Sequence, residues 1–241
     1  MNIVIVKDYY ELSIQAAQIV AAQINKIKKS VLGLPTGQTP LGMYNELIKK
    51  YEKDEIDFSQ VITFNLDEYY GLSPLHPQSY HYFMWNTFFQ HINIKKENVN
   101  MLNGITENID EECQRYENII QIRGGIDLQL LGIGENAHIG FNEPANVLKS
   151  RTHLVNLSNS TVKANSRFFN DIKEVPRQAL TMGMGTIMKA KKIVLLASGK
   201  NKAPALAKTV NGLVSTRVPA SLLQLHKEVT ILVDEDAASR I

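Results

Sequence analysis

The apolar and polar positions along this chain follow two patterns, one typical of strands and one typical of helices. Short runs rich in apolar and β-branched residues predict strands at residues 3–6, 30–34, 61–66, 127–132, 192–197 and 229–233. Between them, apolar residues recur at helical spacing and predict helices at residues 10–28, 109–122, 160–169, 177–190 and 202–210, with one more beginning after Thr39. Strands and helices in this order are typical of βαβ units, so we expect an α/β fold with a largely parallel sheet.

Nothing in the sequence divides the chain into parts. Its 241 residues are 44% hydrophobic, enough for a sizeable core, and no Pro/Gly/Ser-rich linker, repeat or long charge run interrupts them. The 26 Lys and Arg residues against 24 Asp and Glu residues give a net charge of +2, too balanced for the basic surface that nucleic acids require. No apolar run approaches the ~20 residues of a membrane span. We expect a single domain over residues 1–241 that binds neither nucleic acid nor membrane.

Cysteine and histidine usage narrows the chemistry further. Cys113 is the only cysteine, so a single chain can form neither a disulfide nor a cysteine zinc site. His76, His81 and His91 lack ligand spacing and acidic companions, so we assign no metal. The N-terminus lacks the charged head and long apolar core of a secretory signal. We therefore expect a cytoplasmic protein.

The segment 132–144, GIGENAHIGFNEP, carries the clearest candidate chemistry. It directly follows the predicted strand at 127–132. In open α/β sheets the ligand crevice lies outside the carboxyl ends of the strands. The imidazole of His138 and the carboxylate of Glu143 are therefore the first candidates for a proton-transfer pair.

The same segment also matches a dinucleotide-binding pattern. Gly132, Gly134 and Ala137 have the G-x-G-x-x-A spacing after a strand. That pattern needs a helix opening on the glycines and an acidic residue about 20 positions later. No Asp or Glu occurs at positions 144–170, so we do not expect a nicotinamide cofactor.

A second candidate element joins a predicted strand to a helix. The loop residues Thr36, Gly37, Gln38 and Thr39 precede Pro40, which is favoured at the first position of a helix, with Thr39 as its N-cap. Free N–H groups and hydroxyls at such a helix start suit a phosphate group. The pattern lacks G-K-[ST], so it is not a nucleotide P-loop, and an ordinary capped turn remains the alternative.

Two cations could complete a phosphate site. Arg167 lies in the segment NSRFF, and Lys202 follows the predicted strand 192–197. Together they could clamp a phosphate dianion. Taken singly, each is more often a solvated surface charge.

A third element places carboxylates after a strand. Asp67 directly follows the predicted strand 61–66, where partial burial could tune it as a general base. A turn or cap role is the alternative. We expect its neighbour Glu68 to be a structural partner.

Several motifs together resemble the glucosamine-6-phosphate deaminase family. The resemblance covers nearly the whole chain and rests on LGLPTGQTPLG (32–42), FNLDEY (64–69), SYH (79–81), segment 132–144, SRT (150–152) and ALTMGMGTI (179–187), with LQLH (223–226) extending it. It implies a single Rossmann-like α/β domain that converts D-glucosamine 6-phosphate and water into D-fructose 6-phosphate and ammonia, without a cofactor.

The resemblance also implies roles for the candidate residues. His138 would protonate the ring oxygen as the pyranose opens, with Glu143 tuning and orienting the imidazole. Asp67 would shuttle a proton between C2 and C1 through an enolamine. The phosphate would lie on the loop 36–39, held also by Arg167 and Lys202.

This sequence departs from the family pattern at two places. Asn136 stands where many members carry Asp, and a neutral amide can orient the histidine ring but stabilises imidazolium less. Asn146, His153 and Val155 stand where allosteric members place a serine and two basic residues. The chain, which stops at residue 241, resembles the short, unregulated branch, so we expect a monomer rather than an allosteric hexamer.

Two other functions remain open at this stage. A hydrolase resembling 6-phosphogluconolactonase would share the fold and the phosphate clamp but has no need of a carbon base such as Asp67. A phosphosugar-binding regulator would keep the phosphate loop without a reason to hold Asp67, His138 and Glu143 together. The presence of all three favours an enzyme.

Overall fold

Seven parallel strands form the central sheet of the computed structural model, which describes residues 1–169 and 171–241. Their order across the sheet is β1, β10, β9, β6, β2, β3, β5. Their bounds are β1 (Asn2–Val6), β2 (Val31–Leu34), β3 (Ile62–Asn65), β5 (Val99–Asn100), β6 (Leu128–Gly132), β9 (Lys192–Ala197) and β10 (Val229–Asp234). The predicted parallel α/β fold is confirmed.

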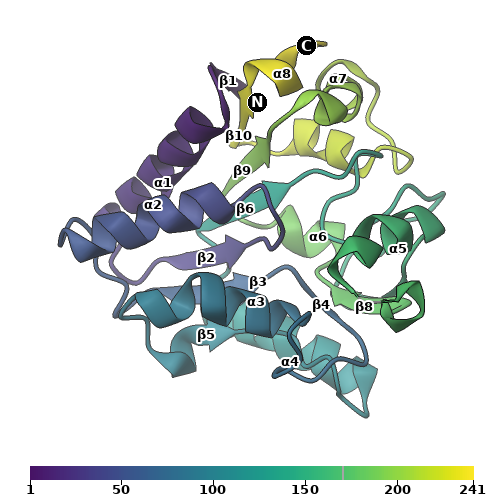
Figure 1. Cartoon of the computed structure of the whole chain (residues 1–241), viewed down its shortest axis with the longest axis horizontal. Coiled ribbons are helices and arrows are strands. Elements are labelled where there is room, and N and C mark those ends of the chain that lie inside the picture. The colour runs from purple at the N-terminus through teal and green to yellow at the C-terminus, as the bar shows by residue number, and fades with distance from the viewer. Residues whose placement is uncertain (170) are drawn as a thin grey trace.

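Helices cover both faces of this sheet (Figure 1). The α-helices of the described chain are α1 (Tyr9–Lys26), α2 (Leu41–Glu52), α3 (Tyr80–Thr87), α4 (Ile109–Ile122), α5 (Asn159–Asn165), α6 (Met184–Ile187), α7 (Ala203–Asn211) and α8 (Glu235–Ala238). Short 3-10 helices span Phe89–His91, Lys96–Asn98, Ser166–Phe168, Ile172–Glu174, Lys200–Lys202 and Pro219–Leu225. Helices α1, α2 and α3 pack on one face and α4, α6 and α7 on the other, so each face buries its own hydrophobic core. In the part of the chain described, no helix has the length and apolarity needed to cross a bilayer.

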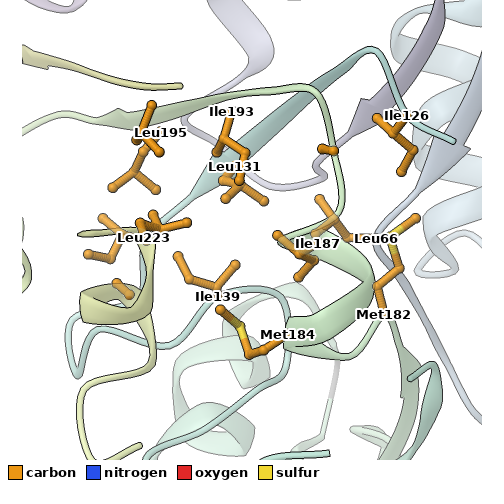
Figure 2. Close-up of a cluster of buried hydrophobic side chains, with 14 of the residues drawn as sticks. Leu66, Ile126, Leu131, Ile139, Met182, Met184, Ile187, Ile193, Leu195 and Leu223 are labelled. Atoms are coloured by element: carbon orange, nitrogen blue, oxygen red, sulfur yellow. The ribbon is translucent and has the colours of Figure 1, made fainter. Parts of the chain in front are cut away.

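The hydrophobic core between the central sheet and α6 also anchors the segment 132–144. Leu131 of β6 packs in this core, and the chain returns to it with Ala137 and Ile139, both 0% exposed. Figure 2 shows Ile139 among Met184 and Leu223, below the sheet residues. These buried neighbours fix the backbone on both sides of His138.

A second, antiparallel sheet of three strands lies beside the first and was not predicted. Its order is β4 (Asp67–Tyr69), β8 (Gln178–Thr181) and β7 (His153–Asn156). The predicted helix at 177–190 is therefore wrong, because its first part forms β8 and only α6 is helical. Gly183 separates the two in an extended conformation, and a Cβ there would lie 2.3 Å from the carbonyl oxygen of Arg151. Tertiary packing thus overrides the local helical pattern.

Other predicted boundaries differ by smaller amounts. The helix at 109–122 and the strand at 192–197 have the predicted bounds. The helix expected at 160–169 is shorter, because α5 ends at Asn165 and a 3-10 helix, Ser166–Phe168, continues it.

Candidate active site

The candidate residues gather at the carboxyl ends of four neighbouring strands. Lys202 follows β9, the segment 132–144 follows β6, the loop 36–39 follows β2, and Asp67 follows β3. In Figure 1, β2 and β6 point towards the side where α5 and β8 lie. Arg167 comes from that side, in the 3-10 helix that continues α5. This edge is where ligands bind in open α/β sheets.

His138 lies on a backbone shaped to receive its ring. A Cβ at Gly134 would lie 2.2 Å from Cε1 of the imidazole, so only glycine lets the ring lie against the chain there. Ala137 has a φ of 68°, a left-handed conformation that side chains rarely adopt. The His138 side chain is 25% exposed, so one part of the ring reaches solvent.

The carboxylate of Glu143 faces His138 and several hydrogen-bond donors. Its Oε2 lies 3.5 Å from His138 Nδ1 and accepts a hydrogen bond from Asn136 Nδ2 at 2.6 Å. Ser158 Oγ lies 3.2 Å from Oε1, and Thr161 Oγ1 also donates to Oε1. Burial alone would raise the pKa of Glu143, but His138, Thr161 and Asn136 outweigh it and lower the pKa to about 2. Glu143 is therefore a permanent anion beside the imidazole.

Asn136 acts on this pair from an unexpected position. Its Oδ1 accepts a hydrogen bond from the backbone N–H of His138 at 3.2 Å, while its Nδ2 holds Glu143. The amide thus reaches the ring only through the carboxylate of Glu143. An amide suits this place because its N–H donates to a carboxylate, whereas a second carboxylate would repel it.

Asp67 occupies a very different environment. It is 6% exposed, lies in β4 opposite Thr181, and its Oδ2 would be 3.4 Å from a Cβ at Gly140. Among the described residues, no group donates a hydrogen bond to its carboxylate, so no turn or cap bond engages it. Burial raises the pKa of Asp67 to about 8, and the charge of Glu68 adds to the shift. A carboxyl group with this pKa can exchange a proton near neutral pH.

Glu68 is the structural partner that we expected. Its carboxylate accepts backbone hydrogen bonds from Tyr69 at 2.9 Å and from Tyr80 and His81 at 2.8 Å each. The last two donors belong to the first turn of α3, so Glu68 attaches that helix to β4. Burial raises the pKa of Glu68 to about 7, and these donors oppose the rise.

The loop 36–39 offers its backbone at the end of β2. Gly37 has a φ of 95°, which turns the chain and exposes the loop. No acceptor in the described part of the chain takes a hydrogen bond from the N–H groups of Thr36, Gly37, Gln38 or Thr39. Four such donors can serve an anion.

The helix that follows this loop begins differently from our prediction. Pro40 is the N-cap of α2, without a side-chain hydrogen bond, so the predicted N-cap role of Thr39 is wrong. The hydroxyl of Tyr9 takes over: it accepts the N–H of Gly42 at 2.9 Å and donates to the carbonyl of Gln38 at 3.1 Å. A side chain distant in sequence thus satisfies the helix start.

Lys202 and Arg167 act on each other electrostatically. Lys202 Nζ donates to the carbonyl oxygen of Ile133 at 2.9 Å, which brings the ammonium to the start of the segment 132–144. Burial lowers the pKa of Lys202; the charge of Glu135 opposes that shift and the charge of Arg167 adds to it. The structure thus brings both predicted cations towards the same side of the site.

Sequence reasoning missed the residues that support this site. Ser158 and Thr161 hold Glu143, and Gly134 makes room for His138. The hydroxyl pair looks like any helix cap in the sequence, and the glycine looks like an ordinary loop residue. Over residues 1–169 and 171–241, no group of three or more His, Cys, Asp or Glu side chains is arranged to hold a metal ion.

Comparison with known proteins identifies relatives along the whole chain. The family model described as glucosamine-6-phosphate isomerases/6-phosphogluconolactonase matches residues 8–232. Proteins named glucosamine-6-phosphate deaminase are 61% identical in a Thermoanaerobacter species, over 100% of this chain and 95% of the relative, and 58% identical in Clostridium acetobutylicum, over the full length of both.

Solved structures give the same result. A monomeric glucosamine-6-phosphate deaminase is 47% identical, with a TM-score of 0.97 over 100% of both chains. A 6-phosphogluconolactonase from Thermotoga maritima, 19% identical with a TM-score of 0.77 over 97% of this chain and 98% of the other, shares the fold alone. The resemblance drawn from the sequence motifs is confirmed, and the chain belongs to the family of glucosamine-6-phosphate isomerases and 6-phosphogluconolactonases.

Proposed function

We propose that this protein is a glucosamine-6-phosphate deaminase, an enzyme that converts D-glucosamine 6-phosphate and water into D-fructose 6-phosphate and ammonia. Relatives of that name at 52–61% identity over the full chain support this activity. The observation that carries it is the contrast between two carboxylates: Asp67 is buried with a pKa of about 8, and Glu143 is an anion with a pKa of about 2. The reaction needs one carboxylate that exchanges a proton near neutral pH and one that stays charged.

Ring opening requires an acid at the sugar's ring oxygen, and His138 supplies it. An imidazole can carry a proton near neutral pH and release it to a substrate oxygen. The carboxylate of Glu143, 3.5 Å from Nδ1, faces that side of the ring and leaves Nε2 for the substrate. Asn136 contributes by holding Glu143.

Isomerisation moves a proton from C2 to C1, and Asp67 performs this transfer. The ionised carboxylate removes the C2 proton, giving an enolamine, and the resulting acid returns a proton to C1. The product is a ketose imine, which water hydrolyses to ammonia and the ketose phosphate. Because the two carbons are adjacent, one carboxylate on one face of the substrate suffices.

The phosphate group binds at the ends of β2 and β9 and beside α5. The backbone donors of Thr36, Gly37, Gln38 and Thr39 face it from the loop, and Arg167 and Lys202 supply positive charge. The lowered pKa of Lys202 reflects burial and the second cation, both of which a bound dianion would offset.

The proposal extends to the oligomeric state and regulation of the protein. We propose a monomer in the cytoplasm, without a cofactor and without activation by N-acetylglucosamine 6-phosphate. At two of the positions that differ from allosteric members, the side chains have partners within the chain: His153 Nδ1 contacts the carbonyl of Arg151 at 2.9 Å, and Val155 packs against a buried cluster. Allosteric control needs contacts that differ between two states.

A coupled assay for ammonia and fructose 6-phosphate tests the proposed function. Purified protein should release both from D-glucosamine 6-phosphate in equal amounts, along a hyperbolic substrate curve. Hydrolysis of 6-phosphogluconolactone, measured in parallel, should remain at the uncatalysed rate. Lactone hydrolysis without ammonia release would contradict the proposal.

A further inference from the structure

The two carboxylate oxygens of Glu143 face different parts of the chain. Oε2 faces the loop of His138, where Asn136 Nδ2 donates to it at 2.6 Å and His138 Nδ1 lies 3.5 Å away. Oε1 faces the start of α5, where Thr161 Oγ1 donates to it and Ser158 Oγ lies 3.2 Å away. The oxygen that does not face the imidazole is therefore held by hydroxyl groups from another element.

Local structure fixes these hydroxyls in place. Ser158 is the N-cap of α5, and its Oγ accepts the backbone N–H of Thr161 at 3.2 Å. Its single hydroxyl proton lies within reach of both Thr161 Oγ1, at 2.9 Å, and Glu143 Oε1. Thr161 is thus the constant donor to Glu143, and Ser158 supports it.

Packing fixes the helix itself against the loop of His138. Val162, which follows Thr161, is 1% exposed in a cluster that contains Phe141 and Tyr69. The ring of Phe141 also stacks on Tyr80, with centroids 6.1 Å apart and planes at 8°. Because Phe141 lies between His138 and Glu143 in the chain, the Thr161 hydroxyl and the carboxylate that it holds belong to one packed unit.

A carboxylate stabilises an imidazolium ion only while one of its oxygens faces the ring N–H. Glu143 has rotatable side-chain bonds, so without a second anchor its carboxylate could turn away from Nδ1. We propose that Thr161, supported by Ser158, is a positioning residue for ring opening that holds Glu143 Oε2 towards His138. This inference rests on the proposed deaminase function.

The same segment contains an internal control for its own folding. Arg167 lies in the 3-10 helix Ser166–Phe168, which directly continues α5. A substitution that displaced the whole segment would move Arg167 and weaken phosphate binding, which raises KM. A substitution that only frees Glu143 lowers kcat, because its effect is confined to the proton-transfer step.

The experiment compares three variants in the ammonia-release assay with D-glucosamine 6-phosphate. Thr161→Val removes the hydroxyl at constant shape and should lower kcat about 10-fold, while KM changes less than about 3-fold. Thr161→Ser keeps a hydroxyl and should restore kcat to within about 3-fold of the wild type. Thr87→Val is the matched control, because among the described residues the Thr87 hydroxyl bonds only the carbonyl of Phe83 within α3, and it should leave both constants unchanged.

A second measurement does not depend on turnover. Loss of the Thr161 hydroxyl removes a donor to the charged form of Glu143, so the pKa of Glu143 should rise in Thr161→Val and return in Thr161→Ser. Carbon-13 NMR of the labelled carboxyl group measures it directly.

Three results would overturn the positioning role. They are an unchanged kcat in Thr161→Val, a loss expressed in KM alone, and a failure of Thr161→Ser to recover activity. If the wild-type protein released no ammonia from D-glucosamine 6-phosphate, the proposed function itself would fail, and this inference with it. If the wild type released ammonia and Thr161→Val had the same kcat and KM as the wild type, only the positioning role would be refuted, and the proposed function would stand.

Discussion

Asp67 and Glu143 are both carboxylates at the same edge of the sheet, yet their surroundings push them in opposite directions. Asp67 lies 6% exposed, next to the charge of Glu68 and without a donor among the described residues, and its pKa is raised to about 8. Glu143 is also largely buried, but His138 and several donors surround it, and its pKa is lowered to about 2.

Burial alone therefore does not determine whether the pKa of a carboxyl group rises or falls. Burial disfavours the charged form in both cases; His138, Thr161 and Asn136 outweigh this effect at Glu143, whereas the charge of Glu68 adds to it at Asp67. Asp67 therefore becomes an exchangeable base near neutral pH, and Glu143 becomes a fixed counter-charge for His138. Pairs of titratable groups whose environments separate their pKa values mark acid and base roles in many active sites.

The largest effect should come from removing the exchangeable base. Asp67→Asn keeps the shape of the side chain but cannot accept a proton from carbon, so kcat should fall ~10²–10⁴-fold while the substrate still binds. Ammonia release and substrate binding by calorimetry measure the two separately. Turnover within about 2-fold of the wild type would remove Asp67 from the carbon-acid step.

The next effect distinguishes Asp67 from the pair His138 and Glu143 by the reaction step that each serves. His138→Gln and Glu143→Gln should each lower turnover of the cyclic sugar by roughly 10²-fold, since a general acid contributes about that much. Exchange of tritium at C2 of an open-chain analogue should survive better, because ring opening is then bypassed. Equal loss of exchange on that analogue would contradict the assignment of His138 to ring opening.

The pH dependence of kcat/KM tests whether Glu68 raises the pKa of Asp67. Because Asp67 acts in its ionised form, kcat/KM should rise with pH through about 8. Glu68→Gln removes the nearby negative charge that raises this pKa, so the rise should move to lower pH, while the one amide oxygen can still accept one of the two N–H groups of α3. Ionisation of the substrate is common to both proteins and cancels in the difference. An unchanged midpoint would exclude coupling between the two carboxylates.

The last effect concerns stability. The folded protein holds the Asp67 proton up to a pKa of about 8, whereas the unfolded chain releases it near the ordinary pKa of an aspartate, 3.8. The folded state thus binds more protons between these values, so the contribution of Asp67 to stability is lost as pH rises through this window. Relative to the wild type, Asp67→Asn should gain on the order of a few kcal/mol in free energy of unfolding between pH 4 and pH 8.5. Urea unfolding of both proteins at the two pH values measures it, and a constant difference would contradict the buried, neutral carboxyl.

The sequence predicted those parts of the fold that depend on local patterns. The helix at 109–122 and the strand at 192–197 have the predicted bounds, because periodicity and flanking turns define them. It failed at 177–190, where an antiparallel strand pairs with β4, a contact between segments about a hundred residues apart. The site edge itself was predictable, since it follows from the parallel strand order.

The opposite electrostatics of the two carboxylates could be predicted only in part. That Asp67 follows a strand is visible in the sequence, and its burial was anticipated as a condition for a base. The donors to Glu143 were not, because Thr161 and Ser158 meet it only through tertiary packing. The same holds for Tyr9, which satisfies the start of α2 from another helix in place of Thr39.

The most direct test of this account is a pH titration of the two carboxyl groups by carbon-13 NMR, with Asp67→Asn and Glu143→Gln used to assign the signals. We expect a midpoint near pH 8 for Asp67 and no titration of Glu143 above about pH 4. Ordinary midpoints near pH 4 for both groups would contradict the division into an exchangeable base and a fixed anion.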